Sequence, residues 1–314
     1  MKPYVCGVDI GGTTVKLGLF TDAGELLEKW EIPTDTGDGG ARILPDIARS
    51  ITDKLAEKQI TPEQVLGIGL GVPGPVSADS TVFRCVNLGW GTFNLRERMN
   101  ELLPAIPHVA AGNDANVAAL GELWQGGGKG SRSAVLITLG TGVGGGVVVD
   151  GKIIAGKRGG AGEIGHITVE PEETEPCACG KRGCLEQYAS AQGIVRLARR
   201  MLAASDTPSA LRAMDSFTAK DICDLARDGE QMALNIVDRC ACYLGRAMSF
   251  VGCLIDPEVF ILGGGMSHAS AVLTDAITRH YKEYVLFVAA DTPIVTASLS
   301  NDAGIYGCAK MVLG

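Results

Sequence analysis

The stretch YVCGVDIGGTTVKLGLF, residues Tyr4–Phe20, decides the fold of this chain. Its apolar residues predict two buried strands, Tyr4–Ile10 and Thr14–Phe20, and the two glycines between them predict a tight turn. Such glycines let backbone N–H groups approach an anion closely, and Asp9 at the strand end is placed to hold Mg²⁺ through water. Taken alone, the same residues fit an ordinary glycine hairpin equally well.

The same order of elements begins again in the second half of the chain. A strand at Ala134–Leu139 leads into the turn Gly140–Gly142 and a strand at Gly145–Val149, and a third strand follows near Ile153. The further elements expected are strands at Glu25–Ile32, Val65–Val72 and Val259–Leu262, and helices at about Ile43–Leu55, Asn94–Leu103, Val117–Gln125, Ala191–Ala204, Thr218–Arg227 and Glu230–Leu254. This repeat predicts two related α/β domains facing each other across a cleft, and a single doubly wound sheet fits the hairpins less well.

The second Gly/Thr turn changes the interpretation of the first. TLGTGVGGG, Thr138–Gly146, occupies the place in its half that DIGGTT occupies in the other, and two such turns form a clamp for a polyphosphate. Neither turn is a P-loop, because no GKS or GKT follows it. A third glycine loop, Gly263–Ser267, follows a strand and opens a helix, which would fit the adenosine end of a nucleotide but is weak evidence alone.

Composition and charge limit the classes of partner. The 314 residues carry a formal net charge of −8 and a sequence pI near 5.1, which argues against a surface for nucleic acid or another polyanion. No apolar run is long enough to span a membrane, and the N-terminus lacks the apolar core of a signal peptide. Ten cysteines without a secretory signal favour the reducing cytoplasm, where clustered thiols bind metal more often than they form disulfides.

The segment GEIGHITVEPEETEPCACGKRGCLE, Gly162–Glu186, contains a complete set of zinc ligands. His166, Cys177, Cys179 and Cys184 fill the four tetrahedral positions, so we expect a structural ion with no open position for a catalytic water. Three reduced core cysteines are the alternative. The acidic residues between them are interpreted as a solvated loop, namely Glu170, Glu172, Glu173 and Glu175.

Together, these motifs resemble a known family. DIGGTT, TLGTGVGGG and FILGGG are similar to the three nucleotide motifs of the sugar kinase–actin–Hsp70 fold, with its two RNase H-like domains and interdomain cleft. GVPGP, NLGW, NDAN, GEIGH and CACGKRGCLE together resemble the ROK family (repressors, open reading frames, kinases), and most of all its bacterial glucokinases. The resemblance covers nearly the whole chain, including the C-terminal NDAGIYGCA.

The resemblance implies a role for each motif. Asp114 in NDAN matches the catalytic base, and a position near a helix N-terminus favours its ionised form, although a helix cap is the structural alternative. The implied sugar ligands are Gly74, Asn87, Asn113, Asp114, Glu163, His166 and Glu186. The implied nucleotide residues are Asp9, Gly11, Gly12, Thr13, Thr14, Lys16, Gly140, Thr141, Gly142, Gly144, Gly264, Gly265 and Met266. One nitrogen of His166 would then bind zinc while the other faces the sugar.

The implied activity is ATP-dependent phosphorylation of a hexose at its C6 hydroxyl, with D-glucose as the leading substrate and Mg²⁺ and structural Zn²⁺ as cofactors. One alternative is a ROK kinase for N-acetylmannosamine, N-acetylglucosamine or allose. Another is a sugar-binding ROK regulator without kinase activity, which would carry an N-terminal helix-turn-helix for which Asp9 leaves no room. An actin-like assembly protein, the third class, has no use for the zinc cluster.

The resemblance also implies a domain division and an assembly. Residues 1–115 would form a small N-terminal domain, with a C-terminal helix at about 301–314 packing back onto it. Residues 116–300 would form a larger domain that contains the zinc insertion. The family suggests a homodimer or a higher homo-oligomer.

Overall fold

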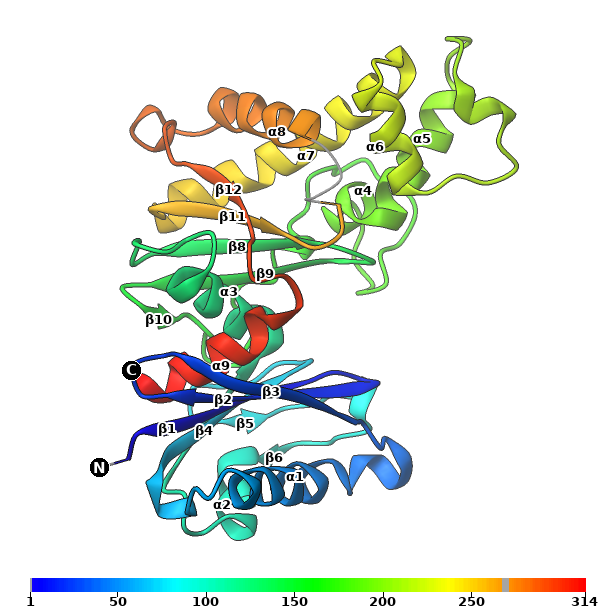
Figure 1. Ribbon diagram of the computed structural model, residues 1–314. Coiled ribbons are helices and arrows are strands. Elements are labelled where there is room, and N and C mark those ends of the chain that lie inside the picture. The colour runs from blue at the N-terminus through cyan, green and yellow to red at the C-terminus, as the bar shows by residue number, and fades with distance from the viewer. Residues whose placement is uncertain (1, 267–270) are drawn as a thin grey trace. The chain divides into compact units, whose positions relative to one another are not determined.

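The structure, a computed structural model, describes residues 2–266 and 271–314 and contains two five-stranded mixed sheets (Figure 1). Contacts within the chain divide it into two compact units. The first runs to Arg132 and includes Gly146–Gly162 and Ser298–Gly314, and the second comprises Ser133–Gly145 and Glu163–Ala297. The predicted α/β fold class is confirmed.

The first sheet has the strand order β3-β2-β1-β4-β7. Its strands are β1 (Tyr4–Ile10), β2 (Thr14–Thr21), β3 (Leu26–Pro33), β4 (Val65–Val72) and β7 (His108–Asn113). Strand β2 pairs antiparallel with β1 and with β3, whereas β4 runs parallel to both β1 and β7. Strand β7 was not predicted, because the small residues in HVAAGN give little strand signal.

The second sheet repeats this order as β10-β9-β8-β11-β12. Its strands are β8 (Ala134–Leu139), β9 (Val143–Val149), β10 (Lys152–Ile153), β11 (Val259–Gly263) and β12 (Ile294–Thr296). Across both sheets, the strands lie in the order third, second, first, fourth and fifth, counted by their order along the chain. This shared order confirms the predicted repeat of architecture. Strand β9 begins two residues before its predicted start, and β12 was not predicted.

The helices also fall into two groups. The helices of the first unit are α1 (Ile43–Glu57), α2 (Leu95–Leu102), α3 (Asp114–Gln125) and α9 (Ala303–Leu313). Those of the second unit are α4 (Glu186–Ala189), α5 (Ala191–Ala203), α6 (Ala219–Arg227), α7 (Gln231–Ile255) and α8 (Ala271–Tyr284). A short hairpin, β5 (Thr81–Val82) with β6 (Phe93–Asn94), precedes α2, and Asn94 caps α2 as predicted by accepting from the Glu97 N–H at 3.1 Å.

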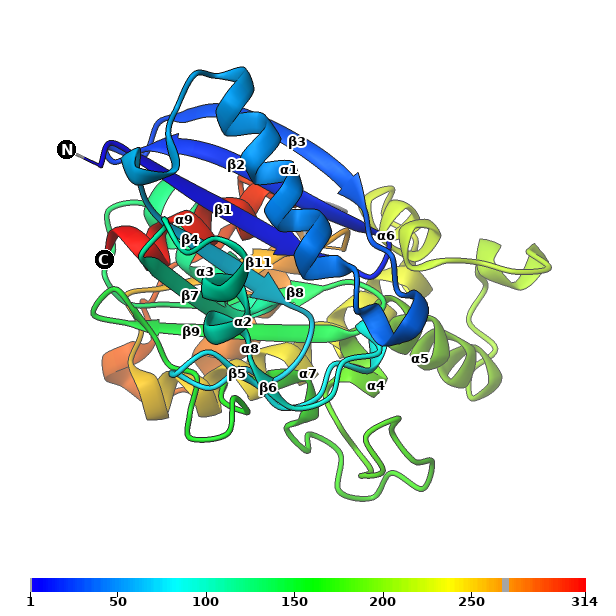
Figure 2. The ribbon, with the colours of Figure 1, turned by 90° about the horizontal axis from the view of Figure 1, so that it is seen from below.

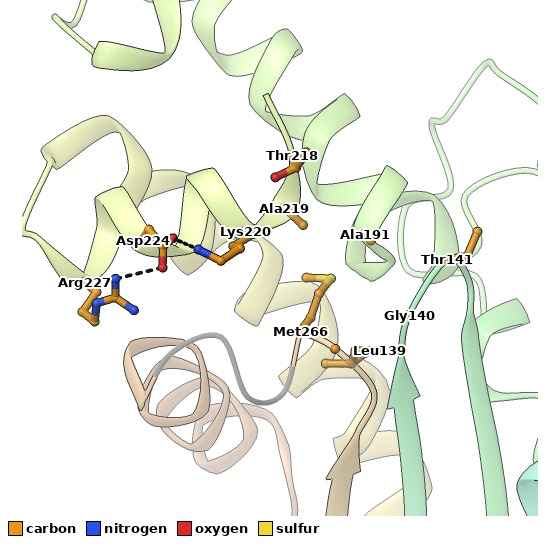
Figure 3. Close-up of a pocket in the computed structure, with 11 residues that line it drawn as sticks. Leu139, Gly140, Thr141, Ala191, Thr218, Ala219, Lys220, Asp224, Arg227 and Met266 are labelled. Carbon is orange, nitrogen blue, oxygen red and sulfur yellow. Dashed lines mark hydrogen bonds and ion pairs between the residues drawn. The ribbon is translucent and has the colours of Figure 1, made fainter. Parts of the chain in front are cut away.

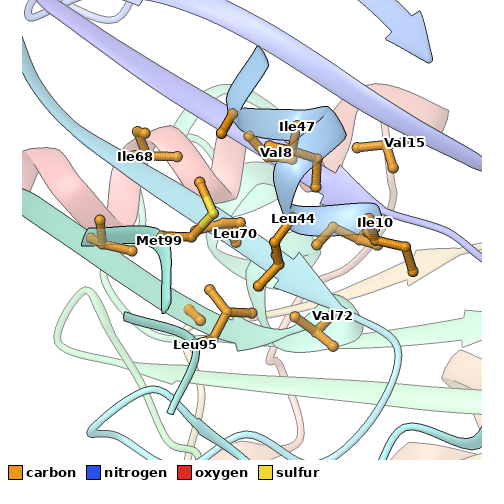
Figure 4. Packing of buried hydrophobic residues seen from close by; sticks show 14 of the residues in the cluster. Val8, Ile10, Val15, Leu44, Ile47, Ile68, Leu70, Val72, Leu95 and Met99 are labelled. Carbon is orange, nitrogen blue, oxygen red and sulfur yellow. The ribbon is translucent and has the colours of Figure 1, made fainter. Parts of the chain in front are cut away.

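The first sheet is covered on both faces. Side chains alternate along β1, so Cys6, Val8 and Ile10 lie on one face and Val5 on the other. The first face packs against α1 and α2, through residues such as Leu44, Ile47, Leu95 and Met99 (Figure 4). The second packs against Ile305 and Ala309 of α9, and Figure 2 shows α1 and α9 on opposite faces.

The compact units do not follow one cut in the sequence. Helix α3 groups with the first unit and contacts α9, and α9 also packs on β1 and β4. The domain division expected from the sequence, 1–115 with about 301–314 and then 116–300, stays a prediction. None of the helices in residues 2–266 and 271–314 is long and apolar enough to cross a membrane.

Candidate functional site

Thr34, the residue that follows β3, holds the first Gly/Thr turn in place. The Gly11 N–H donates to the Thr14 carbonyl at 3.0 Å, and the Thr34 hydroxyl donates to the Gly11 carbonyl at 2.7 Å. Thr34 also donates its N–H to the Thr13 carbonyl at 2.9 Å. These bonds leave Gly12 and Thr13 exposed, as an anion-binding turn requires. Thr34 belongs to no recognisable sequence motif, so its contact with the turn was not predicted.

Asp9 lies beside this turn in an environment that disfavours its charge. It pairs with Lys16 across β1 and β2, and a Cβ at Gly304 would lie 2.5 Å from its Cγ, so α9 can approach the carboxyl only with glycine there. The pKa of the Asp9 carboxyl is raised to about 6, chiefly by burial and then by the charge of Asp114, while Lys16 lowers it. Lys16 itself donates to the Asn301 carbonyl at 3.1 Å.

Asp114 is the first residue of α3, and its neighbour is the cap. The side chain of Asn113 accepts from the Asn116 N–H at 3.1 Å, so the helix cap expected within NDAN is Asn113 and not Asp114. One carboxylate oxygen of Asp114 accepts from the Asn113 side-chain amide and from the Ala115 N–H, both at 2.8 Å. Donors at a helix N-terminus stabilise the ionised form and orient it.

The remaining sugar-site residues of the first unit differ in their surroundings. The Asn113 amide also donates to the Gly74 carbonyl at 3.2 Å, which brings two of the expected residues together. Asn87 is exposed in the 3₁₀ helix Val86–Leu88. Trp90 of NLGW is buried and donates its indole N–H to the Gly40 carbonyl at 3.1 Å, so its role is to hold a loop of this unit.

The second Gly/Thr turn is fixed by the two helices that follow the cysteine segment. The Gly140 N–H donates to the Gly142 carbonyl at 3.0 Å, and Ala191 at the start of α5 donates to the Gly140 carbonyl at 2.8 Å. The carboxylate of Glu186 accepts from the Val143 N–H at 3.0 Å, and a Cβ at Gly142 would lie 2.4 Å from that carboxylate. Gly142 therefore makes room for Glu186. Gly144, expected in the turn, lies within β9.

A cavity of about 630 Å³ opens beside this turn in the second unit (Figure 3). Leu139, Gly140 and Thr141 line it together with Gly265 and Met266, so two of the predicted nucleotide motifs meet. Gly264 turns the chain there with φ +83. Ser267, the last residue of the predicted loop, lies outside the described residues.

The opposite wall of this cavity was not predicted from the sequence. It comes from α6 and its cap Thr218, and carries Lys220, Asp224 and Arg227. Asp224 pairs with both Lys220 and Arg227, as the dashed lines in Figure 3 show. The helix was predicted, but periodicity alone does not tell which of its faces lines a cavity.

The four predicted metal ligands lie together. Their ligand atoms are within 4.8 Å of one another, with Cys179 Sγ 3.6 Å from Cys184 Sγ and Cys177 Sγ 3.9 Å from His166 Nδ1. Ligand atoms around tetrahedral zinc with thiolate bonds of about 2.3 Å are roughly 3.8 Å apart. The residues therefore fit a structural ion of this kind.

The two ring nitrogens of His166 have different neighbours. Its Nδ1 is directed to the cysteine cluster, whereas its Nε2 lies 4.0 Å from the carboxylate of Glu163. Both residues belong to one turn, the 3₁₀ helix Ile164–His166 with its preceding residue. The two side chains are partly exposed, at 32% for the histidine and 56% for the glutamate, so both remain accessible to a ligand.

The interpretation of the acidic residues as a solvated loop is wrong for Glu173. Its side chain is 1% exposed and accepts hydrogen bonds from Tyr188, Arg196 and Arg200. These donors hold the pKa of the Glu173 carboxyl far below its usual range, with the Arg200 hydrogen bond as the largest cause. A run of four glutamates in a Pro-containing loop gives no sign that one of them meets arginines 23 and 27 residues later.

The structure thus places the predicted residues in two sets. The first unit holds Asp9, the first Gly/Thr turn, Gly74, Asn87, Asn113 and Asp114. The second unit holds the second turn, the glycine loop at Gly264, the metal ligands, Glu163 and Glu186.

This fold, with a Gly/Thr turn at the start of each sheet, defines a protein of the sugar kinase–actin–Hsp70 class. The family model described as "ROK family" matches residues 5–314, and the chain belongs to the ROK family.

Its relatives include kinases of known structure. The chain is 44% identical to a glucokinase of Halalkalibacterium halodurans, over 97% of this chain and 93% of the relative. A ROK family glucokinase of Streptomyces griseus, solved in complex with glucose and AMPPNP, is 31% identical, with 98% of each chain covered and a TM-score of 0.71. A ROK hexokinase of Thermus thermophilus is 30% identical over 98% of this chain and 97% of that one, with a TM-score of 0.80.

Proposed function

We propose that this protein is an ATP-dependent glucokinase that transfers the γ-phosphoryl group of ATP to the C6 hydroxyl of D-glucose. The observation that carries the proposal is the position of Asp114. Its carboxylate begins α3 and accepts from the Asn113 amide and the Ala115 N–H, so its orientation is fixed. A fixed carboxylate of this kind accepts the proton of the sugar hydroxyl as that oxygen forms its bond to phosphorus and ADP leaves.

The phosphate side uses backbone groups of the two Gly/Thr turns. The exposed Gly12 and Thr13 supply N–H and hydroxyl donors, and Gly140 and Thr141 do the same in the second unit. We assign the cavity beside Met266 to the adenosine end of ATP, because 630 Å³ is of the size that a small-molecule site requires.

The residues present fit a divalent cation near Asp9. Burial and, to a smaller extent, the charge of Asp114 raise the pKa of this carboxyl to about 6. A bound cation would offset both the cost of burying the charge and the repulsion between the two carboxylates. Mg²⁺ supplies charge neutralisation at the transferring phosphoryl group when it is bound. Asp9 would hold it, and Asp114 would remain the proton acceptor.

The residues proposed for the sugar are Asn113 and Asp114 in the first unit, and Glu163, His166 and Glu186 in the second. They offer amide, carboxylate and imidazole groups that match the hydroxyls of a hexose. The proposed metal is zinc, held by His166 and the three cysteines, and its task is structural. It would fix the imidazole so that Nε2 stays available to the sugar.

Glucose is favoured over an N-acetylated hexose by the 44% identity to a glucokinase. The competing substrates are N-acetylmannosamine, N-acetylglucosamine and allose, and the competing class is a regulator that binds sugar without phosphorylating it. We further propose a cytoplasmic location, consistent with ten free thiols, and a homodimer or higher oligomer of the kind that the family suggests.

The test is a coupled ADP-release assay with ATP–Mg²⁺ across a panel of these sugars. We expect the highest kcat/KM with glucose, and the Asp114→Asn variant should retain glucose binding by isothermal titration while losing turnover by about three orders of magnitude or more. Near-normal turnover in this variant would remove Asp114 from its role. Sugar binding without turnover in the unmodified protein would favour the regulator.

A further inference from the structure

Glu173 is a buried anion at the centre of a cluster that no part of the proposed reaction uses. We name Glu173, Glu175, Tyr188, Arg196 and Arg200 the Glu173 cluster. Arg200 binds both oxygens of Glu173, at 2.8 and 3.1 Å, and Arg196 reaches the same carboxylate at 2.5 Å. The Tyr188 hydroxyl donates to it as well. A carboxylate with only 1% of its side chain exposed is stable there because these donors replace water.

The cluster joins three segments that carry the sugar and metal ligands. Glu173 precedes the ligand Cys177 by four residues, within the same loop. Tyr188 belongs to α4, whose first residue is Glu186. Arg196 and Arg200 project from α5, which also anchors the second Gly/Thr turn through Ala191. One buried carboxylate therefore ties the metal loop to α4 and α5.

A second bridge runs beside the first. The side chain of Gln187 accepts from the Cys184 N–H at 3.1 Å and donates to the Glu175 carbonyl at 3.0 Å. Arg196 donates to the Gln187 carbonyl at 3.1 Å, and its guanidinium lies 5.5 Å from the centre of the Tyr188 ring. The bridge connects the metal ligand Cys184 with the residues around Glu173, and none of its bonds involves a metal.

We infer that Glu173 is a positioning residue that holds the cysteine loop and Glu186 in their binding arrangement before metal binds. Because the carboxylate anchors the loop to two helices, the loop has less conformational freedom to lose when metal binds. This lowers the entropy cost of assembling the four ligands. The same fixation sets Glu186 at the second Gly/Thr turn. The part of the inference that concerns sugar rests on the proposed function, and the part that concerns metal does not.

Glu173→Gln is the variant that tests this inference, because it keeps the side-chain size but leaves Arg196 and Arg200 without their buried counter-charge. We expect zinc transfer to a colorimetric chelator to be about 10- to 100-fold faster than in the zinc-loaded unmodified protein. The KM for glucose should rise about tenfold while kcat stays within about twofold, because the proposed base is on α3 of the other unit.

Glu175→Gln is the matched control. Glu175 pairs with the same two arginines, Arg196 and Arg200, at 2.9 Å each, but its side chain is 59% exposed. An exposed pair contributes little, so zinc transfer and KM should stay within about threefold of the unmodified protein. If Glu173→Gln does not fold, Tyr188→Phe removes one bond to the carboxylate, and about three- to tenfold faster zinc transfer is expected.

The possible outcomes separate the two proposals. Faster zinc transfer with a raised KM supports the inference. A lower melting temperature with unchanged zinc transfer and KM would overturn it, because Glu173 would then only stabilise the fold. Equal effects in Glu175→Gln would overturn it too. If the unmodified protein phosphorylates no sugar, the proposed function fails, and the zinc measurements still decide whether Glu173 positions the metal loop.

Discussion

At the scale of single residues, the charge of the buried Asp9 carboxylate destabilises the folded protein. Burial and the charge of Asp114 raise its pKa to about 6, above the value of about 4 that an unfolded chain gives. The folded protein therefore binds more protons than the unfolded chain between these values. Its free energy of unfolding falls as pH rises through this window.

Asp9→Asn should therefore stabilise the metal-free protein at pH 8, by roughly 1–3 kcal/mol, because a neutral amide avoids the penalty of the buried charge. The difference should shrink below pH 5, where Asp9 is increasingly protonated. Urea denaturation at pH 4.5 and pH 8 measures it, and kinase activity should be largely lost. Asp114→Asn, the comparison variant, should show part of the same stabilisation. An Asp9→Asn variant less stable than the original protein at pH 8 would contradict this account.

Gly142 shows a second effect of one residue. Its missing Cβ leaves the place that the Glu186 carboxylate takes, and that carboxylate is at the end of a flexible side chain. Gly142→Ala should therefore displace Glu186 and leave the fold intact. We expect the KM for glucose to rise roughly tenfold, with a melting temperature close to that of the original protein.

Gly160→Ala is the control for this prediction. A Cβ at Gly160 meets no atom of the described residues within 4 Å, so the KM for glucose should not change. Equal KM values for glucose in both variants would argue against a sugar role for Glu186.

At the scale of elements, Glu122 links α3 to the segment before α9. Its buried carboxylate accepts from the backbone N–H groups of Gly127, Ser298 and Leu299, at 2.9, 3.0 and 2.8 Å. Glu122→Gln replaces one accepting oxygen by an NH₂ group that opposes these donors. We expect a loss of roughly 2–3 kcal/mol in the free energy of unfolding, measured with urea. Glu101→Gln, at an exposed position of α2, should change it by less than about 0.5 kcal/mol.

Most elements could be predicted from the sequence because their signals are local. The predicted bounds of β1, β4 and β8 agree with the structure, and α7 is displaced by one residue at each end. Strands β7 and β12 gave no such signal. His108–Asn113 is half alanine and glycine, and β12 has only three residues, so the sheets and not their own propensities make them strands.

At the scale of the whole molecule, the metal cluster joins residues from two ends of a long loop, His166 and Cys184. Removal of zinc with a chelator should lower the melting temperature and weaken glucose binding at least tenfold, because Glu163 and Glu186 lose their common support. Calorimetric titration with glucose and metal analysis on the same sample measure both. Full activity in zinc-free protein would return the cysteines to a packing role.

Cys177→Ala should reproduce the chelator result, with a lower metal content, weaker glucose binding and reduced stability. Cys253→Ala is the control, since this exposed cysteine lies outside the metal cluster. A loss of glucose binding in both variants would show that the effect does not come from the metal.

As with the fold, one part of the candidate site could be predicted from the sequence and another part could not. The two Gly/Thr turns could be predicted because each is a short motif of neighbouring residues, and the candidate metal site because its four residues are a recognisable set of zinc ligands within one segment. The environment of Asp9 and the α6 wall of the cavity could not, because each depends on a neighbour from another element.

The sequence by itself determined the repeated order of strands and helices, the family and the four residues that could hold a metal ion. Only the tertiary structure decided that Glu173 is buried, that Trp90 packs on a loop, and that Gly142 makes room for Glu186. The physical reason is the range of the interactions. Periodicity and turn chemistry act between near neighbours in the chain, whereas a buried charge is stable only where distant segments bring donors to it.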